Sequence, residues 1–168
     1  LVHDVPRACK AQEKGKHKAI GVKVIEPNHR TGLYALPLPS GLGSEAAGTV
    51  AALGEGVTGF QIGDRVGYSS GAIGSYADAN NVPDTKLVKL PDAISDEVAD
   101  AILLKGMTAQ YLLRQIHAVK AGETIVFHAD AGGVGQNGVQ WAKHQGATVI
   151  ATTTAPDNIA TAKHHGRD

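Results

Sequence analysis

The chain has 168 residues, 42% of them hydrophobic and 19% charged, a composition typical of a globular protein with room for one domain or for one domain and part of another. Sixteen basic residues balance sixteen acidic ones, so no overall field draws the protein to nucleic acid or to an anionic membrane. No apolar run approaches the ~20 residues of a membrane span. The single cysteine, Cys9, excludes an intrachain disulfide and favours a reducing, cytoplasmic setting.

Residues 1–94 are predicted to be rich in β-structure. The 21 glycines of the chain are spread along it rather than gathered in a linker, which is typical of many tight turns. An apolar run at 46–53 ends at the glycine turn 54–56, and short alternating segments follow at 65–68 and 87–90. Short strands separated by glycine in this way predict a small barrel or sandwich.

The pattern then becomes helical. Ser95 suits an N-cap, and two acidic residues follow it, where the helix dipole favours negative charge. We expect one helix over residues 95–104, an interruption at Gly106, and a second helix over 107–117.

The last fifty residues alternate between strand and helix. A β-branched, almost wholly apolar segment at 124–129 predicts a buried strand. A helical pattern follows at 134–145 and a second strand at 148–152, and Pro156 fits the first turn of another helix. This order predicts one strand–helix–strand unit with parallel strands and then a further helix.

A glycine-rich loop, Ala131-Gly132-Gly133-Val134-Gly135, joins the first of these strands to its helix. Backbone N–H groups at such a helix N-terminus, together with the helix dipole, favour a phosphate. A Cβ at Gly133 or Gly135 would hold a diphosphate or the neighbouring strand away, so the interpretation requires that no side chain cover these amides. Because the spacing is not a strict G-x-G-x-x-G, the alternative is a tight turn without a ligand.

The end of the second strand bears on which dinucleotide would bind. An NAD site usually has an acidic residue there to hold the ribose 2′-hydroxyl. This chain has Thr152-Thr153-Thr154 and no acid before Asp157, so a 2′-phosphate is not repelled and NADPH is preferred over NADH. The alternative is that these threonines serve only as strand residues and a helix cap.

Four blocks of sequence together carry a resemblance to a known family. They are Arg30-Thr31-Gly32-Leu33-Tyr34; residues 39–48 continuing to Gly63-Asp64-Arg65-Val66; residues 104–113; and residues 127–143 around the glycine loop. In these blocks the chain resembles the zinc-free quinone oxidoreductases of the medium-chain dehydrogenase/reductase superfamily, which are relatives of zeta-crystallin.

The resemblance implies an α/β protein in two parts. A β-rich GroES-like catalytic domain is expected over residues 1–115, and the first part of a Rossmann-type parallel sheet over residues 116–168, with NADPH and substrate in the cleft between them. It also implies the reduction of a quinone by NADPH, and a homodimer. The residues that it implies for cofactor binding are Thr108, Gly132, Gly133, Val134 and Gly135.

Zinc-dependent alcohol dehydrogenases belong to the same superfamily and need separate exclusion. A structural zinc site usually takes four cysteines, and this chain has one. Where the zinc enzymes read Gly-His-Glu, this chain reads Gly43-Ser44-Glu45, so a ligating histidine is missing. Cys9 and His17 have no third partner at ligand spacing, and we expect a metal-free protein.

Residues 23–29 depart from the family pattern. Lys23 stands where an asparagine is expected and Asn28 where an aromatic residue is expected, two positions that face the nicotinamide or the substrate in the family. The Lys23 ammonium either steers an electron-rich substrate or points into solvent, and Pro27 should disturb a helix here. The departure leaves open an alkenal or enone reductase on the same scaffold, or a non-catalytic, crystallin-like protein that binds NADPH.

No catalytic residue is assigned from the sequence. Tyr34, Tyr68 and His128 are candidates by chemistry only, and each is better explained by packing or hydrogen bonding within its own segment. Hydride transfer belongs mainly to the cofactor, so this absence is acceptable.

Two expectations concern the last residues and the chain as a whole. Asn158 stands where relatives often have a lysine for the 2′-phosphate, and Lys163 or Arg167 would have to replace it. A complete dinucleotide domain has about six parallel strands, of which this sequence supplies two. We therefore expect the sequence to be part of a longer molecule, with an intact mass above 17.3 kDa.

Overall fold

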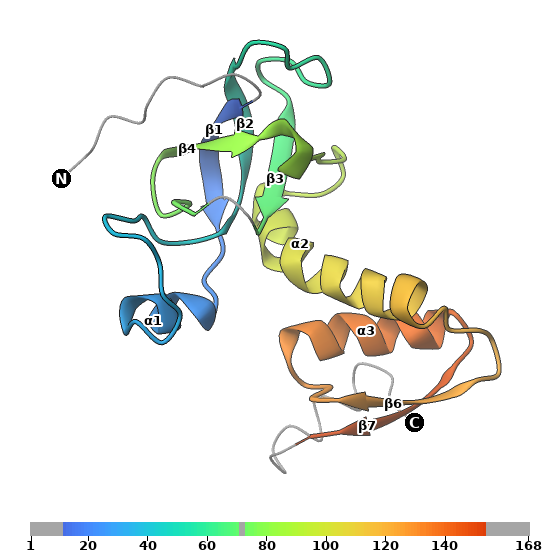
Figure 1. Ribbon diagram of the computed structural model, residues 1–168. Coiled ribbons are helices and arrows are strands. Elements are labelled where there is room, and N and C mark those ends of the chain that lie inside the picture. The colour runs from blue at the N-terminus through green and yellow to red at the C-terminus, as the bar shows by residue number, and fades with distance from the viewer. Residues whose placement is uncertain (1–11, 71–72, 154–168) are drawn as a thin grey trace. The chain divides into compact units, whose positions relative to one another are not determined.

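The computed structural model describes residues 12–70 and 73–153 (Figure 1). The chain divides into two compact units, Leu1–Leu104 and Lys105–Asp168, and helix α2 (Asp96–Tyr111) runs through the division. Each unit has a hydrophobic core cluster of its own. The expected domain boundary after residue 115 stays a prediction.

The first unit is built on a five-stranded antiparallel sheet with the strand order β4-β1-β2-β3-β5 (Figure 1). A single 3₁₀ turn, Asp84–Lys86, joins the last two strands. This sheet confirms the β-rich character expected of the first part of the chain. The strands are β1 (Gln12–Ile20), β2 (Glu45–Leu53), β3 (Arg65–Ser69), β4 (Ala79–Pro83) and β5 (Leu87–Lys89).

Small residues in β2 allow the central strands to approach closely. Ala46 is fully buried and packs with Tyr68 and Val82 in the core of the sheet. A Cβ added to Gly48 would collide with the backbone oxygen of Lys16 in β1. Glycine at this position is therefore a requirement of strand pairing.

Helix α1 (Ile25–Arg30) contradicts the expectation that Pro27 should disturb a helix here. Pro27 is the third residue of the helix, and the N–H groups of a first turn have no intrahelical acceptor, so proline loses nothing there. Its carbonyl still accepts a hydrogen bond from the N–H of Thr31 at 2.9 Å. The buried Glu26 closes the start of the helix, since its Oε2 accepts the N–H of Lys23 at 2.7 Å.

Helix α2 begins as expected and then continues where a break was expected. Ser95 caps it, accepting the N–H of Val98 on its hydroxyl oxygen at 3.3 Å. The expected interruption at Gly106 is wrong, because the helix runs unbroken to Tyr111 and ends in a π-type turn at Leu112–Ile116. A glycine in a helix costs about 1 kcal/mol relative to alanine, which weakens a helix of 16 residues without ending it. No helix among the described residues has the length and apolar character needed to cross a bilayer.

The second unit contains two parallel strands with a helix between them. Strands β6 (Thr124–His128) and β7 (Thr148–Thr152) pair in parallel, and α3 (Gly133–His144) connects them (Figure 1). This confirms the strand–helix–strand unit predicted from the sequence, with α3 one residue away from its expected bounds. The helix expected near Pro156 lies outside the described residues.

Successive side chains of β6 and β7 point to opposite faces of the small sheet, and α3 packs on one of these faces. Val149 is fully buried in a cluster with Val139 and Ala142 of the helix. The side chains of the other face, Val126 and Ile150, are 57% and 51% exposed. Apolar surface on this face of the described sheet therefore remains open to solvent, as expected for strands with partial cover.

Candidate cofactor-binding site

The turn between β6 and α3 is a tight, strained connection. Ala129, directly after the strand, has φ 55°, a left-handed conformation that is unusual for a residue other than glycine. Its carbonyl accepts the N–H of Gly132 at 2.9 Å. The N–H of Asp130 donates to the carbonyl of Thr152 at 3.3 Å, so the turn is also tied to the end of β7. The turn thus lies at the carboxyl edge of both strands.

The N-terminus of α3 lacks a side-chain cap. Gly132 is the N-cap residue, with φ −75° and ψ 164°, and no side-chain hydrogen bond closes the helix start. The first N–H groups of an α-helix have no acceptor within the helix. Gly132 and Gly133 are exposed, and the first turn holds no acidic residue. These donors and the helix dipole make an environment that favours an anion.

Gly135 is required by the packing of the turn on itself. The residue is buried, and a Cβ there would collide with the carbonyl oxygen of Ala129 and lie 2.5 Å from the α-carbon of Asp130. Both neighbours are backbone atoms, which cannot move aside as a flexible side chain can. Glycine at 135 therefore allows the helix to begin directly against the strand end, whether or not a nucleotide is bound.

Gly133 has a different neighbour, which the sequence did not predict. A Cβ there would lie 2.7 Å from Cδ and 2.9 Å from Cε of Lys105, a half-buried residue of α2. Gly133 itself remains exposed, and the expectation that no side chain covers the amides of the loop stays a prediction. The neighbouring group is the flexible stem of a cation, which attracts a phosphate rather than repelling it.

Two further residues of the second unit bear on the site. Asp130 lies within the β6–α3 turn and is 1% exposed. An acid directly before the glycine loop is the sequence signal that could have identified it. Thr108 is half-buried one helical turn after Lys105, on the same side of α2.

The end of β7 carries hydroxyl groups. The hydroxyl oxygen of Thr152 lies 2.9 Å from Nδ1 of His128, so a side-chain hydrogen bond links the ends of the two parallel strands. His128, a candidate acid–base residue by chemistry, is thus engaged in a contact between strands. Thr152 and Thr153 are the last described residues of this segment, and neither is acidic. The positions considered for a 2′-phosphate, Asn158, Lys163 and Arg167, lie outside the described residues, as do Thr154 and Asp157.

Lys23 does not point into solvent, so that alternative from the sequence is wrong; the steering of a substrate by its ammonium stays a prediction. Its Nζ lies 2.9 Å from Oε2 of Glu45, with the two side chains 7% and 1% exposed. The other oxygen of Glu45 accepts the backbone N–H of Leu104 at 2.6 Å. A Cβ at Gly21 would lie 2.7 Å from Glu45 Oε2 and 3.2 Å from Asp100 Oδ1, so a second buried carboxylate stands nearby. The ammonium is the counter-ion of a buried acidic cluster in the first unit.

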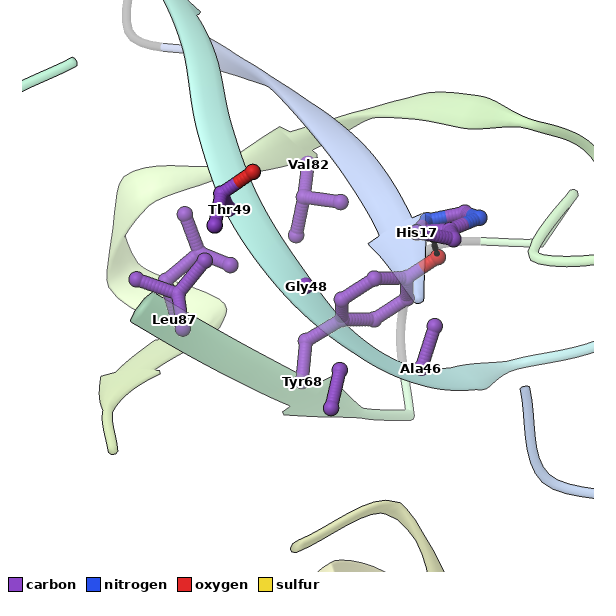
Figure 2. Close-up of a pocket in the computed structure, with 9 residues that line it drawn as sticks. His17, Ala46, Gly48, Thr49, Tyr68, Val82 and Leu87 are labelled. Carbon is purple, nitrogen blue, oxygen red and sulfur yellow. Dashed lines mark hydrogen bonds between the residues drawn. The ribbon is translucent and has the colours of Figure 1, made fainter. Parts of the chain in front are cut away.

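Tyr68 and His17 form a second buried polar group within the sheet (Figure 2). Nδ1 of His17 lies 2.7 Å from the carbonyl of Ala77, which can only accept, so Nδ1 carries the proton. In the neutral ring Nε2 is then an acceptor, and the hydroxyl of Tyr68 donates to it at 3.0 Å. Asn80 in turn donates to the tyrosine oxygen at 3.3 Å.

The surroundings of this pair favour the uncharged form of both groups. Burial raises the pKa of Tyr68 to about 12, and burial lowers the pKa of His17 despite the carbonyl of Ala77, which acts in the opposite direction. The cavity beside them, walled by Ala46, Val82 and Leu87, has a volume of about 10 Å³ (Figure 2). This volume is about that of one water molecule and is too small for an organic substrate, so Tyr68 serves packing and hydrogen bonding within the sheet.

The remaining candidates of the first unit do not form a reactive arrangement. The ring of Tyr34, half-exposed, meets the ring of His29 edge-on, with centroids 6.3 Å apart. The carbonyl of Asn28 accepts the N–H of Tyr34 at 3.2 Å. Over residues 12–70 and 73–153, histidine, cysteine and acidic residues form no group of three that could hold a metal ion. Cys9 lies outside these ranges.

Comparison with known proteins agrees with this arrangement. Residues 15–92 match the alcohol dehydrogenase GroES-like domain. A quinone oxidoreductase of Pseudomonas aeruginosa is 50% identical over 152 residues, which are 90% of this chain and 47% of that protein. A 2-haloacrylate reductase of a Burkholderia species is 43% identical over 162 residues, covering 92% of this chain and 48% of that protein.

Solved structures give the same result. The structure of Escherichia coli quinone oxidoreductase complexed with NADPH has a TM-score of 0.92 and 43% identity, and the match covers 99% of this chain and 52% of that chain. The chain thus spans about half the length of the relatives that it matches. Three observations indicate the same family. They are the GroES-like match, the antiparallel sheet of the first unit and the glycine turn that follows a parallel strand in the second unit. Over the half of their length that it spans, this chain is similar in sequence and in fold to the quinone oxidoreductases of the medium-chain dehydrogenase/reductase superfamily.

Proposed function

We propose that the protein reduces a quinone with electrons from NADPH and without a metal ion. The observation that carries this proposal is the uncapped N-terminus of α3, directly after a parallel strand, in a chain 43% identical to an Escherichia coli quinone oxidoreductase solved with NADPH. The nicotinamide supplies the hydride, and a quinone can take its protons from water. No side chain is assigned as a catalytic acid or base.

The residues proposed to bind the cofactor all belong to the second unit. The exposed Gly132 and Gly133 would present backbone N–H groups to the diphosphate, and Gly135 would keep the helix start close to the strand end. Val134 and Thr108 complete the proposed set. The positive end of α3 would stabilise the diphosphate charge.

NADPH is proposed in preference to NADH because of the end of β7. Thr152 and Thr153 supply hydroxyl groups where an NAD site would have a carboxylate. A carboxylate there would repel a 2′-phosphate, and a hydroxyl does not. The Escherichia coli structure that this chain resembles holds NADPH.

A second activity of the same kind is favoured by one comparison. The Burkholderia relative at 43% identity is named a 2-haloacrylate reductase, which acts on an electron-poor alkene. An alkene conjugated to a carbonyl group accepts hydride as a quinone does. An alkenal or enone reductase on this scaffold is therefore the alternative.

A non-catalytic protein that binds NADPH is the remaining candidate. It is favoured by Asn28, which offers no aromatic surface to a nicotinamide or a quinone, and by Lys23, whose ammonium is paired with Glu45.

We further propose that the protein is a homodimer and that it lies in the cytoplasm. The first proposal rests on the resemblance to the family, and the second on the lone cysteine.

Steady-state oxidation of NADPH, followed by its absorbance, with a simple benzoquinone or an enone as acceptor, tests these candidates. Turnover with the quinone supports the leading proposal, and faster turnover with the enone supports the alternative activity. Saturable NADPH binding without turnover of either acceptor would favour the binding protein. Failure to bind NADPH at all would refute all three.

A further inference from the structure

The side chain of Lys105 crosses the first residue of α3. A Cβ built on Gly133 would lie 2.7 Å from Lys105 Cδ, 2.9 Å from Cε and 3.3 Å from Cγ. Three successive carbons of the lysine therefore run over the α-carbon of this glycine, and the ammonium nitrogen is one bond beyond Cε. Both residues belong to the same compact unit, so the contact does not depend on how the two units are arranged.

This contact brings a full positive charge to a helix end that is already electropositive. Helix α3 has 12 residues, no side-chain cap and no acidic residue in its first turn. The glycine backbone supplies only partial charges from N–H groups and the helix dipole. An ammonium group beside them adds a charge-assisted donor, which is the stronger kind of hydrogen bond to a phosphate oxygen.

The buried Asp130 places an acidic group in the same turn as the glycines. Its carboxylate lies in the same β6–α3 turn and is 1% exposed, so its charge is poorly screened by water. A negative charge at this place opposes a diphosphate at the helix start, and a nearby cation offsets that repulsion. A lysine ammonium has three N–H donors, so Lys105 can serve a protein group and a phosphate oxygen at the same time.

We propose that Lys105 binds the diphosphate of NADPH, its ammonium donating to a diphosphate oxygen while its stem lies on Gly133. The inference rests on the proposed function, because it takes NADPH as the ligand. It adds to the glycines a charged side chain from a different segment of the chain. It also explains why glycine stands at 133, since any side chain there would displace the lysine stem.

The test compares the affinity of the intact protein for two probes, NADPH and adenosine 2′-monophosphate, which lacks the diphosphate. The variants are Lys105→Met, Lys105→Gln and Lys105→Arg, with Lys120→Met as the matched control. Lys120 is exposed and precedes β6, whereas the glycine turn follows that strand, roughly 16 Å away. Circular dichroism checks that each variant is folded.

Removal of the charge in Lys105→Met and Lys105→Gln should weaken NADPH binding by about tenfold and leave adenosine 2′-monophosphate unaffected. Lys105→Arg should keep most of the NADPH affinity, and Lys120→Met should keep all of it. Unchanged NADPH affinity in both neutral variants would overturn the inference, as would equal weakening of both probes, which would assign Lys105 to the 2′-phosphate. If the unaltered protein does not bind NADPH, the proposed function itself is refuted. That result can be distinguished from the two results that overturn only the role of Lys105, because in both of those the unaltered protein binds NADPH.

Discussion

Lys23 and Glu45 form an ion pair in which Nζ and Oε2 are 2.9 Å apart and both side chains are more than nine-tenths buried. The pair joins the segment before α1 to the first residue of β2. Because Glu45 also accepts the backbone N–H of Leu104, a single carboxylate connects three parts of the first unit. The lysine therefore contributes to the stability of that unit, and the proposed chemistry does not depend on its charge facing a substrate.

Removal of the Lys23 ammonium should be strongly destabilising. Lys23→Met leaves Glu45 charged, buried and without its counter-ion, and about 3–5 kcal/mol of unfolding free energy should be lost. Adding Glu45→Gln should recover part of the loss, since the amide oxygen still accepts the Leu104 N–H without a charge. Urea unfolding measures both changes.

The control for this pair is Lys18, whose ammonium lies 3.8 Å from Asp96 with its side chain 55% exposed. Lys18→Met should change the free energy of unfolding by less than about 1 kcal/mol, as is usual for exposed pairs. Equal losses at Lys18 and Lys23 would contradict the assignment of a buried pair.

The glycine turn should not tolerate a side chain at 135. Gly135→Ala places a methyl group against the backbone of Ala129 and Asp130, so we expect a loss of about 1–3 kcal/mol of stability, together with loss of NADPH binding. Gly59→Ala is the matched control, because it is exposed and a Cβ there would meet no atom within 4 Å. Thermal unfolding and nucleotide titration of both variants check this. A Gly135→Ala protein that behaves like Gly59→Ala would show that the turn is looser than described.

Gly106 should be replaceable with a gain in stability. It lies inside α2, and no atom would lie within 4 Å of an added Cβ. Gly106→Ala should therefore stabilise the protein by about 0.5–1 kcal/mol, because alanine loses less backbone entropy on folding. The measurement is the shift of the urea midpoint. A destabilised variant would indicate that the position is occupied by another part of the protein.

Acid should weaken the first unit through His17. Burial lowers its pKa below the usual 6.5, so below pH 6.5 the unfolded chain binds the proton more readily than the folded chain. The contribution of His17 to the free energy of unfolding is fully present above about pH 6.5 and is lost as the pH falls through the lowered pKa of its ring. His17→Gln should flatten that part of the curve of unfolding free energy against pH.

The same exchange at the exposed His144 should leave the slope in place. A His17→Gln protein with an unchanged acid slope would contradict the assignment of the slope to His17.

The sequence predicted the second unit better than the details of the first. The β-branched, almost wholly apolar run of β6 and the glycines between β6 and α3 are local signals, so the strand–helix–strand unit could be predicted from them. Pro27 and Gly106 misled the prediction because a proline is tolerated in the first turn of a helix, and because one glycine does not end a long, cooperatively formed helix.

Two contacts that the sequence did not predict join residues that are far apart along the chain. The partner of Lys23 is Glu45, and the residue over Gly133 is Lys105. Neither pairing follows from the spacing of residues, because each depends on how separate elements pack. Asp130 was visible beside the glycines, but its burial becomes evident only when the turn is folded.

The most direct test of the account is a titration of the folded protein with NADPH, read from the fluorescence of Trp141, the single tryptophan, which lies in α3. We predict saturable quenching at one site, tighter for NADPH than for NADH, and its loss in Gly135→Ala but not in Gly59→Ala. A folded protein that shows no saturable change with either nucleotide would contradict the claim that the start of α3 holds a dinucleotide.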